Sequence, residues 1–298
     1  MRDKGPILIP LDGSELAEGA LAYGVAFAKA LGERVVLVTA WEGTETELAS
    51  GFPAMAMEIE QKAGDFYTTY LEGIRARIGD SVHVETHVVT GDAAEQILKA
   101  ADTVQARLLV IATHGRSGIG RWVYGSTASR LMRESHIPVV AVGPHALQRS
   151  TAEVAVNHLM VPLDGSPLSE AALPVAQALA AALKGRISLV RAVRWAVQTY
   201  PYSLPDAYIP QVDQELEAGA KAYLQGQEAA VKSAPVDAFV VRGAVADGLL
   251  DVVEKQAVDL VVMTTHARRG LARAALGSTA DRMLQGKAPV LLVPPEQK

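Results

Sequence analysis

The chain of 298 residues repeats its own sequence at a constant offset. Residues 7–14 (ILIPLDGS) return as residues 159–166 (LMVPLDGS), so that Asp12 and Asp164 lie 152 positions apart (164 − 12). A period of this length indicates a duplicated domain, because solenoid repeats are far shorter. We therefore predict two similar domains, 1–147 and 155–298, separated by a linker at 148–154. The same offset joins three further pairs: Gly91 with Gly243, His114 with His266, and Gly125-Ser126 with Gly277-Ser278.

Each half alternates short apolar runs with longer amphipathic segments. Residues 35–38 (VVLV) and 108–111 (LLVI) are continuous in apolar side chains, which is typical of strands covered on both faces. Strands that alternate with helices favour a parallel sheet. We predict the α/β class: two doubly wound, Rossmann-like domains, each a five-stranded parallel sheet with helices on both faces. The expected strands of the first half are 6–11, 34–41, 82–90, 107–112 and 138–142, and its expected helices are 15–31, 57–78, 92–105 and 127–132. In the second half, the first strand should recur near 159–163, followed by strands at 186–193, 238–242, 259–264 and 289–293. Residues 196–210 are expected to form a loop.

Composition narrows the classes of function. The chain is 49% hydrophobic and 20% charged, a balance typical of globular proteins. Its net charge of −5 argues against general attraction to nucleic acid or to an anionic membrane. Zero cysteines exclude a disulfide framework and thiol catalysis. The first residues do not read as a signal peptide, and the longest apolar stretch, 171–183, is too short to span a bilayer, so we expect the cytoplasm.

Residues 112–126 (ATHGRSGIGRWVYGS) read as a glycine-rich loop between a strand and a helix. The first N–H groups of a helix have no intrahelical partner, and the helix dipole adds partial positive charge there. Glycines let the backbone approach a ligand closely, and Ser126 and Thr127 add hydroxyl groups. The pattern favours a phosphate-binding loop. The alternative is a glycine-rich turn in which Ser126 only caps its helix.

These motifs resemble the universal stress protein family in its tandem, two-domain form, and the resemblance covers nearly the whole chain. The residues that carry it are the Pro-Leu-Asp-Gly-Ser ending of the first strand, the Thr-His-Gly-Arg loop and the later Gly-Ser. The family's nucleotide motif is Gly, two residues, Gly, nine residues, then Gly with Ser or Thr. Its positions in this chain are Ala112, Gly115, Gly125 and Ser126 in the first half and Thr264, Ala267, Gly277 and Ser278 in the second.

The first copy of this motif departs once from the family pattern, and the second departs twice. Alanine at a position that needs a left-handed backbone costs roughly 1–2 kcal/mol, which is about five- to thirty-fold in affinity. We therefore expect the first site to be the better one, provided that the replaced positions are left-handed. The second half keeps Gly277-Ser278-Thr279, and three arginines in its loop offer charge to a phosphate: Arg268, Arg269 and Arg273.

The resemblance implies an adenine-nucleotide site in each half. It implies that Asp12 and Asp164 border the adenine and ribose and that Ala40 and Ala192, at the end of the second strand, face the base. The alternative for each Asp-Gly-Ser segment is an ordinary turn in which the serine caps the following helix. The residues expected to bind ATP are Pro10, Asp12, Ala40, Ile111, Ala112, Gly115, Arg116, Gly125, Ser126, Thr127, Pro162, Asp164, Ala192, Met263, Thr264, Ala267, Arg268, Gly277, Ser278 and Thr279.

His114 and His266 hold the same place in the two loops and are the candidates for a general base. The sequence offers no clear dyad for either, which favours a structural role, and we expect no catalytic residue. The other histidines lack metal-ligand spacing, so we expect no metal site built by the protein, and Mg²⁺ would arrive on the nucleotide phosphates. The loop also lacks the lysine of the Gly-Lys-Ser/Thr phosphate loop.

We expect an ATP-binding, non-enzymatic universal stress protein with a stress-response or regulatory role. Two alternatives stay open: a slow ATPase or phosphoryl-transfer enzyme on the same fold, and a nucleotide-free interaction scaffold. Single-domain relatives resemble dimers joined along an edge strand, so we expect an intramolecular pseudo-dimer with pseudo-two-fold symmetry, joined through 139–142 and 290–293. A homodimer of chains is also open. The expected partner is an adenine nucleotide, with no nucleic acid and no membrane.

Overall fold

The computed structural model describes residues 1–43, 51–113, 124–147, 154–194, 197–198, 207–208, 210–264 and 276–295. The chain divides into two compact units, Met1–Val154 and Ala155–Lys298. Within the described residues, no helix is both long enough and apolar enough to cross a membrane.

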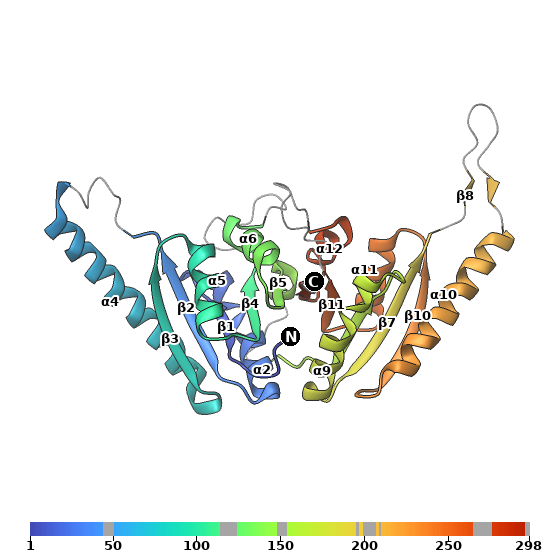
Figure 1. Cartoon of the computed structure of the whole chain (residues 1–298), viewed down its shortest axis with the longest axis horizontal. Helices are drawn as coiled ribbons and strands as arrows, with labels where there is room; N and C mark the ends of the chain where they lie inside the picture. Colours follow the sequence, from blue (N-terminus) through green and yellow to red (C-terminus); the bar gives the residue numbers. More distant parts are fainter. Residues whose placement is uncertain are drawn as a thin grey trace, which may run out of the picture. The chain divides into compact units, whose positions relative to one another are not determined.

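The described residues of the first unit form a parallel sheet of five strands in the order β3-β2-β1-β4-β5 (Figure 1). The strand order reverses between β1 and β4, which pair with Ile7 opposite Leu108. In doubly wound sheets, ligands bind beyond the carboxyl ends of the strands at such a switch point. The strands are β1 (Ile7–Pro10), β2 (Val35–Trp41), β3 (Val84–Thr90), β4 (Leu108–Ala112) and β5 (Val139–Val142).

Consecutive buried residues explain why helices cover both faces of this sheet. Ile7, Leu8 and Ile9 are all fully buried in β1, and successive strand residues point to opposite faces. Right-handed crossovers place α2 and α4 on one face and α5 and α6 on the other. Figure 1 shows α5 and α6, which pack on each other, in front of the sheet. The helices are α1 (Glu15–Glu18), α2 (Leu21–Leu31), α4 (Pro53–Ile78), α5 (Ala93–Thr103), α6 (Ser126–Glu134) and α7 (Pro144–Leu147), with a 3₁₀ turn at Gly79–Ser81.

The helix predicted at 15–31 is interrupted after α1, so that prediction is wrong in detail. The Ala20 amide donates to the Ala17 carbonyl at 3.1 Å, a three-residue hydrogen bond that breaks the α-helical pattern. A Cβ at Gly19 would lie 2.5 Å from Cδ2 of Leu147, so glycine permits a close approach at the break. The Ser14 hydroxyl accepts from the Ala17 amide at 3.1 Å and caps α1.

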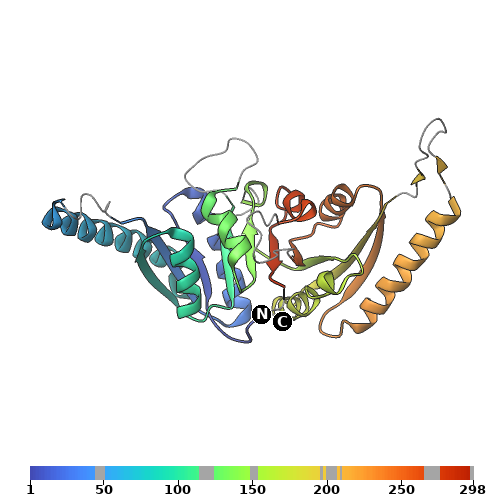
Figure 2. The same ribbon diagram turned by 45° about the horizontal axis from the view of Figure 1, so that its top comes forward.

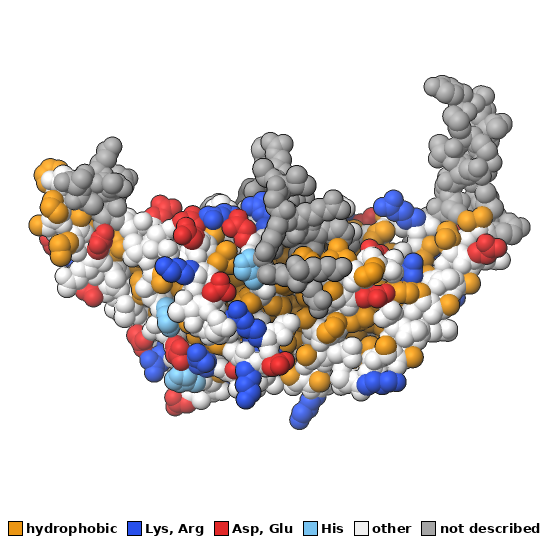
Figure 3. All heavy atoms as spheres, in the orientation of Figure 1, with side chains coloured by type: hydrophobic (Ala, Val, Ile, Leu, Met, Phe, Trp, Pro, Cys, Tyr) orange, Lys and Arg blue, Asp and Glu red, His pale blue; other side chains and the backbone are white. Residues whose placement is uncertain are grey.

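Helix α4 packs on the edge strand β3 of its own unit (Figure 2). Pro53 occupies its first turn, where a missing N–H costs nothing, and Gly79 ends it with a φ of +67°. The early turns leave large apolar side chains in solvent: Phe52 is 65% exposed and Met57 is 71% exposed. Figure 3 shows hydrophobic side chains on the surface near the start of α4.

The second unit repeats this plan, and its described strands have the order β10-β7-β6-β11-β12. The predicted doubly wound α/β architecture is thus confirmed in both units. The loop predicted at 196–210 is not wholly irregular, because β8 (Val197–Gln198) and β9 (Ala207–Tyr208) pair in antiparallel fashion within it. The remaining elements are β6 (His158–Pro162), α8 (Pro167–Glu170), α9 (Leu173–Leu183), β7 (Arg186–Val193), α10 (Pro210–Ala230), β10 (Val236–Arg242), α11 (Val245–Lys255), β11 (Leu260–Thr264), α12 (Ser278–Met283) and β12 (Val290–Val293).

Candidate functional site

A cavity of about 280 Å³ opens at the carboxyl ends of β1, β2 and β4, where the strand order of the first unit reverses. Ile97 of α5, Ile111 of β4 and Leu131 of α6 are almost fully buried and form its apolar wall. Alanine at position 40, near the end of β2, leaves space between these walls. The lining residues are Pro10, Leu11, Asp12, Ala17, Ala40, Ala93, Ile97, Ile111, Ala112, Gly125, Ser126, Thr127, Ala128 and Leu131.

The turn after β1 places a carboxylate at the edge of this cavity. Gly13 has a φ of +83°, a left-handed conformation that favours glycine. Oδ1 of Asp12 accepts hydrogen bonds from the Ser14 amide at 2.9 Å and from the Ser14 hydroxyl at 2.6 Å. Asp12 is therefore a turn residue, as the ordinary alternative predicted, and a lining residue of the cavity at the same time.

Helix α6 begins at the cavity without a side-chain cap. Its N-cap residue is Gly125, for which no capping side-chain hydrogen bond is found among the described residues. Ser126 is the first residue of the helix, so the alternative in which Ser126 only caps the helix is wrong. The first N–H groups of a helix have no intrahelical partner, and the helix dipole adds partial positive charge there. This arrangement suits an anionic group.

The second unit has a corresponding cavity of about 450 Å³. Its helix α12 also starts at a glycine, Gly277, without a side-chain cap from the described residues. Asp164 lies at the edge, and its Oδ1 accepts from the Ser166 amide at 2.9 Å. The lining residues are Pro162, Leu163, Asp164, Ser169, Val190, Ala192, Val245, Leu249, Met263, Thr264, Leu276, Gly277, Ser278, Thr279 and Ala280.

Hydrogen bonding favours the charged form of Asp164. Burial raises the pKa of this carboxyl group, but hydrogen bonds from Ser166 and Ser169 outweigh burial and hold the pKa below its usual value. The second cavity therefore presents a carboxylate at neutral pH.

Every described residue that was predicted to bind ATP lines one of the two cavities. Eight of these line the first cavity and eight line the second. Four predicted residues, Gly115, Arg116, Ala267 and Arg268, lie outside the described residues, as do the candidate bases His114 and His266. The role of these residues as nucleotide ligands stays a prediction.

Helices α5 and α11 supply lining residues that sequence reasoning missed. Ala93 and Ile97 of α5 correspond to Val245 and Leu249 of α11 at the 152-residue offset. Residues four apart share one face of a helix. The signal that could have found them is the combination of this spacing with the internal repeat.

The backbone at the first motif position corrects one expectation. Ala112 ends β4 and Thr264 ends β11, and neither belongs to the described non-glycine residues with positive φ, which are Gln105, Lys184 and Ala257. The condition of a left-handed backbone is therefore not met at Ala112 or at Thr264, so the expected cost does not arise there. The third replaced position, Ala267, lies outside the described residues.

Two doubly wound α/β units, each with a cavity at its switch point, place the chain in the class of tandem Rossmann-like proteins. A family model described as "Universal stress protein family" matches residues 5–143 and 155–294. The chain belongs to the universal stress protein family, as its motifs predicted.

Individual relatives agree with this assignment. A universal stress protein of Mycobacterium tuberculosis strain H37Rv is 29% identical over 189 residues, which are 63% of this chain and 62% of the relative. The match thus spans less than two thirds of that relative's length. A universal stress protein of Thermus aquaticus is 30% identical over 139 residues, 46% of this chain and 96% of the relative. The crystal structure of a universal stress protein from Archaeoglobus fulgidus has a TM-score of 0.70 at 15% identity and covers 99% of this chain and 98% of its own, which shows a shared fold.

Proposed function

We propose that the chain binds adenine nucleotides, with one ATP site in each domain. The observation that carries the proposal is the same in both cavities: an apolar wall lies beside a helix start whose N-cap residue is a glycine, Gly125 or Gly277, which has no side chain to cap the helix. An adenine ring is stabilised by flat apolar contacts, and phosphates are stabilised by N–H donors in positive potential. Each cavity offers the two environments side by side.

The lining residues suggest a role for each part of the ligand in the first domain. Ile97 and Ile111 would contact the base, and the small Ala40 would leave it room beside the backbone of β2. The Asp12 carboxylate would accept hydrogen bonds from ribose hydroxyls. The amides of Ser126 and Thr127 would receive the phosphates, with Mg²⁺ carried on the nucleotide. Because the backbone of β2 would read the base, we expect ATP to bind more tightly than GTP.

We propose binding rather than catalysis. Among the described lining residues, the titratable groups are Asp12 in the first cavity and Asp164 in the second, and both are held by the serine of their own turn. Within the described ranges, no group of three or more His, Asp or Glu side chains could hold a metal ion. A slow ATPase is the second candidate, and a scaffold without nucleotide is the third.

A regulatory role in the stress response, in the cytoplasm, completes the proposal. The family name and the matched family model support it. In such a role, occupancy of the sites by ATP would be the signal that a partner protein reads.

Calorimetric titration of the whole chain with ATP and Mg²⁺ tests the binding. Ala40→Leu fills the first cavity and Ala192→Leu fills the second, because both side chains line them. We expect the wild type to bind at two sites, each single variant to lose one of them, and the double variant to bind nothing. Ala54→Leu, on the exposed start of α4, is the matched control that keeps both sites.

Two outcomes distinguish the alternatives. No heat of binding for the wild type at millimolar ATP would favour the scaffold. Release of inorganic phosphate from ATP, abolished by Ser126→Ala, would favour the ATPase. One solved universal stress protein is in complex with cAMP, and the titration panel includes that nucleotide beside GTP, ADP and AMP.

A further inference from the structure

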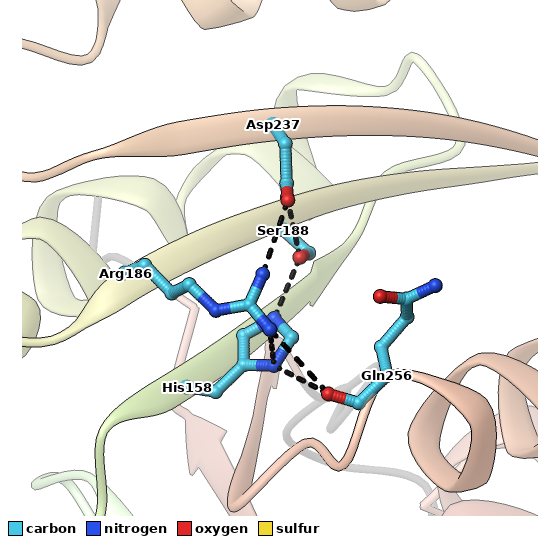
Figure 4. A network of polar contacts seen from close by, with 5 residues as sticks. All are labelled: His158, Arg186, Ser188, Asp237 and Gln256. Carbon is cyan, nitrogen blue, oxygen red and sulfur yellow. Dashed lines mark hydrogen bonds and ion pairs between the residues drawn. The ribbon is translucent and has the colours of Figure 1, made fainter.

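A polar network with a buried centre lies at the amino ends of β6, β7 and β10, at the opposite end of these strands from the cavity (Figure 4). It consists of His158, Arg186, Ser188, Asp237 and Gln256, here called the His158 network. His158 is 3% exposed and Ser188 is fully buried. Buried polar groups must satisfy one another, so a change of protonation inside the network has structural consequences.

Ser188 fixes the proton on one side of the imidazole. Its hydroxyl donates to Oδ1 of Asp237, which leaves the Ser188 oxygen to accept from Nε2 of His158 at 2.7 Å. A neutral histidine carries a single ring proton. With that proton on Nε2, Nδ1 of His158 is an acceptor.

Nδ1 faces a donor and an acceptor at the same distance. Nη2 of Arg186 lies 2.9 Å from it, and the carbonyl oxygen of Gln256 also lies 2.9 Å away. In the neutral state, the Arg186 nitrogen donates to Nδ1 and, at 3.5 Å, to the Gln256 carbonyl. A proton on Nδ1 would point toward Gln256 but would leave two cationic donors 2.9 Å apart. The neutral arrangement and the protonated one are therefore incompatible.

The first domain lacks this device. At the 152-residue offset, Pro6 stands in place of His158 and the fully buried Val36 in place of Ser188. The arginine and its carboxylate are kept, because Arg34 pairs with Glu85 at 2.8 Å. The histidine and the serine that bonds it thus occur together in the second domain. The first domain differs in this respect: Nε2 of its His83 lies 3.6 Å from Oε1 of Glu85, and the His83 side chain is 68% exposed rather than buried.

The charges around His158 come from three elements. Arg186 at the start of β7 is cationic, and Asp237 of β10 is anionic. Asp259, just before β11, accepts from the backbone amide of His158 at 3.0 Å. Burial lowers the pKa of His158, and Arg186 lowers it further, while the Gln256 carbonyl, Asp237 and Asp259 oppose the shift without cancelling it.

We propose that the His158 network is an acid-sensitive element of the second domain: protonation of Nδ1 separates the imidazole from Arg186 and loosens the amino ends of β6, β7 and β10. In the first domain, Pro6 and Val36 stand in place of His158 and Ser188, so the Arg34–Glu85 pair has no buried imidazole against it. Acidification therefore weakens one half of the chain before the other.

The direction follows from linkage. The folded-state pKa of His158 lies below that of the unfolded chain, which is about 6.5. The contribution of the neutral network is fully present above that pH and is lost as the pH falls from about 6.5 toward the folded-state pKa. Within this window, the folding equilibrium constant of the second domain falls by up to about tenfold per pH unit.

Two measurements on the whole chain test the proposal. In NMR titration of the histidine ring signals, with His158 assigned from a His158→Gln sample, we expect the midpoint of His158 below about 6.5, the value of an unperturbed histidine. In hydrogen exchange, we expect protection factors in β6, β7 and β10 to fall by up to about tenfold per pH unit below about pH 6.5 relative to β1, β2 and β3. Comparison within one chain cancels the effect of pH on intrinsic exchange.

Variants separate titration from mere structural damage. His158→Gln should remove the extra pH dependence of the second domain. Arg186→Gln should raise the midpoint of His158, because the competing cation is gone. The proposal is overturned if His158 titrates at or above about pH 6.5, if both domains lose protection equally, or if Arg186→Gln leaves the midpoint unchanged.

Discussion

Gly125 and Gly277 occupy the same position at the start of α6 and α12 but differ in backbone conformation. The φ of Gly125 is −54°, which any residue adopts. The φ of Gly277 is +95°, in the region that favours glycine. Neither position is crowded: a Cβ at Gly277 would meet nothing within 4 Å, and one at Gly125 would lie 3.9 Å from the Thr113 carbonyl. Backbone strain alone therefore distinguishes them.

Alanine at these two positions should have unequal effects. We expect Gly277→Ala to lower the unfolding free energy of the second domain by roughly 1–2 kcal/mol. The matched change Gly125→Ala should stay within about 0.5 kcal/mol in the first domain. Urea denaturation followed by domain-resolved hydrogen exchange measures both. Equal losses in the two domains would contradict the assignment of strain to Gly277.

The difference in φ between Gly125 and Gly277 shows what residue identity alone could not predict. The Gly-Ser pair at 125–126 and its copy at 277–278 placed both helix starts at their cavities, because the pair itself marks the position. The strain expected from the departures was not transferable, since Ala112 is an ordinary strand residue. The same residue type at equivalent positions of the two domains therefore does not determine the backbone φ, which is −54° at Gly125 and +95° at Gly277.

At the scale of elements, Gly24 sets how closely α2 approaches β1. A Cβ at this position would lie 2.2 Å from Cδ1 of Ile9 and 2.9 Å from its Cγ1. In the second domain, Ala176 occupies the corresponding position and is fully buried. The two domains therefore pack their second helices against the sheet with different clearances.

Gly24→Ala should destabilise the first domain. Overpacking costs about 1–3 kcal/mol, and the better helix propensity of alanine returns up to about 1 kcal/mol. The control is Gly73→Ala on α4, where a Cβ meets nothing within 4 Å, so that the propensity gain of up to about 1 kcal/mol remains. Equilibrium unfolding of both variants by denaturant checks the opposite signs. A gain of stability in Gly24→Ala would show that α2 shifts freely.

Elements whose signal is local were predicted well, and features that depend on tertiary contact were not. The strand predicted at 186–193 matches β7, which begins directly after Gly185. The close approach of Leu147 to Gly19, just after α1, joins residues that are far apart in sequence. The wall that α5 adds to the cavity likewise depends on which face the helix turns to the sheet.

At the scale of the whole molecule, the repeat was the most informative feature of the sequence. It predicted two α/β domains, and it paired equivalent positions across them. The repeat did not predict the His158 network, because His158, Ser188 and Asp237 lie on three strands that are adjacent only in the folded sheet. Ser188, a polar residue between the apolar Ile187 and Leu189 at the position of Val36 in the first copy, was the available signal.

Because the two cavities are lined by different parts of the chain, we can predict how each domain responds when ATP is added to the whole chain. The first cavity is lined from residues 10 to 131 and the second from residues 162 to 280, each within its own compact unit. A ligand that binds only the folded state stabilises it by about 2.7 kcal/mol at roughly one hundred times its Kd. We therefore expect ATP with Mg²⁺ to raise hydrogen-exchange protection in both domains of the wild type. Ala40→Leu should remove this gain from the first domain alone, and Ala192→Leu should remove it from the second alone. Loss of the gain in both domains of Ala40→Leu would instead mean that the two sites are energetically coupled.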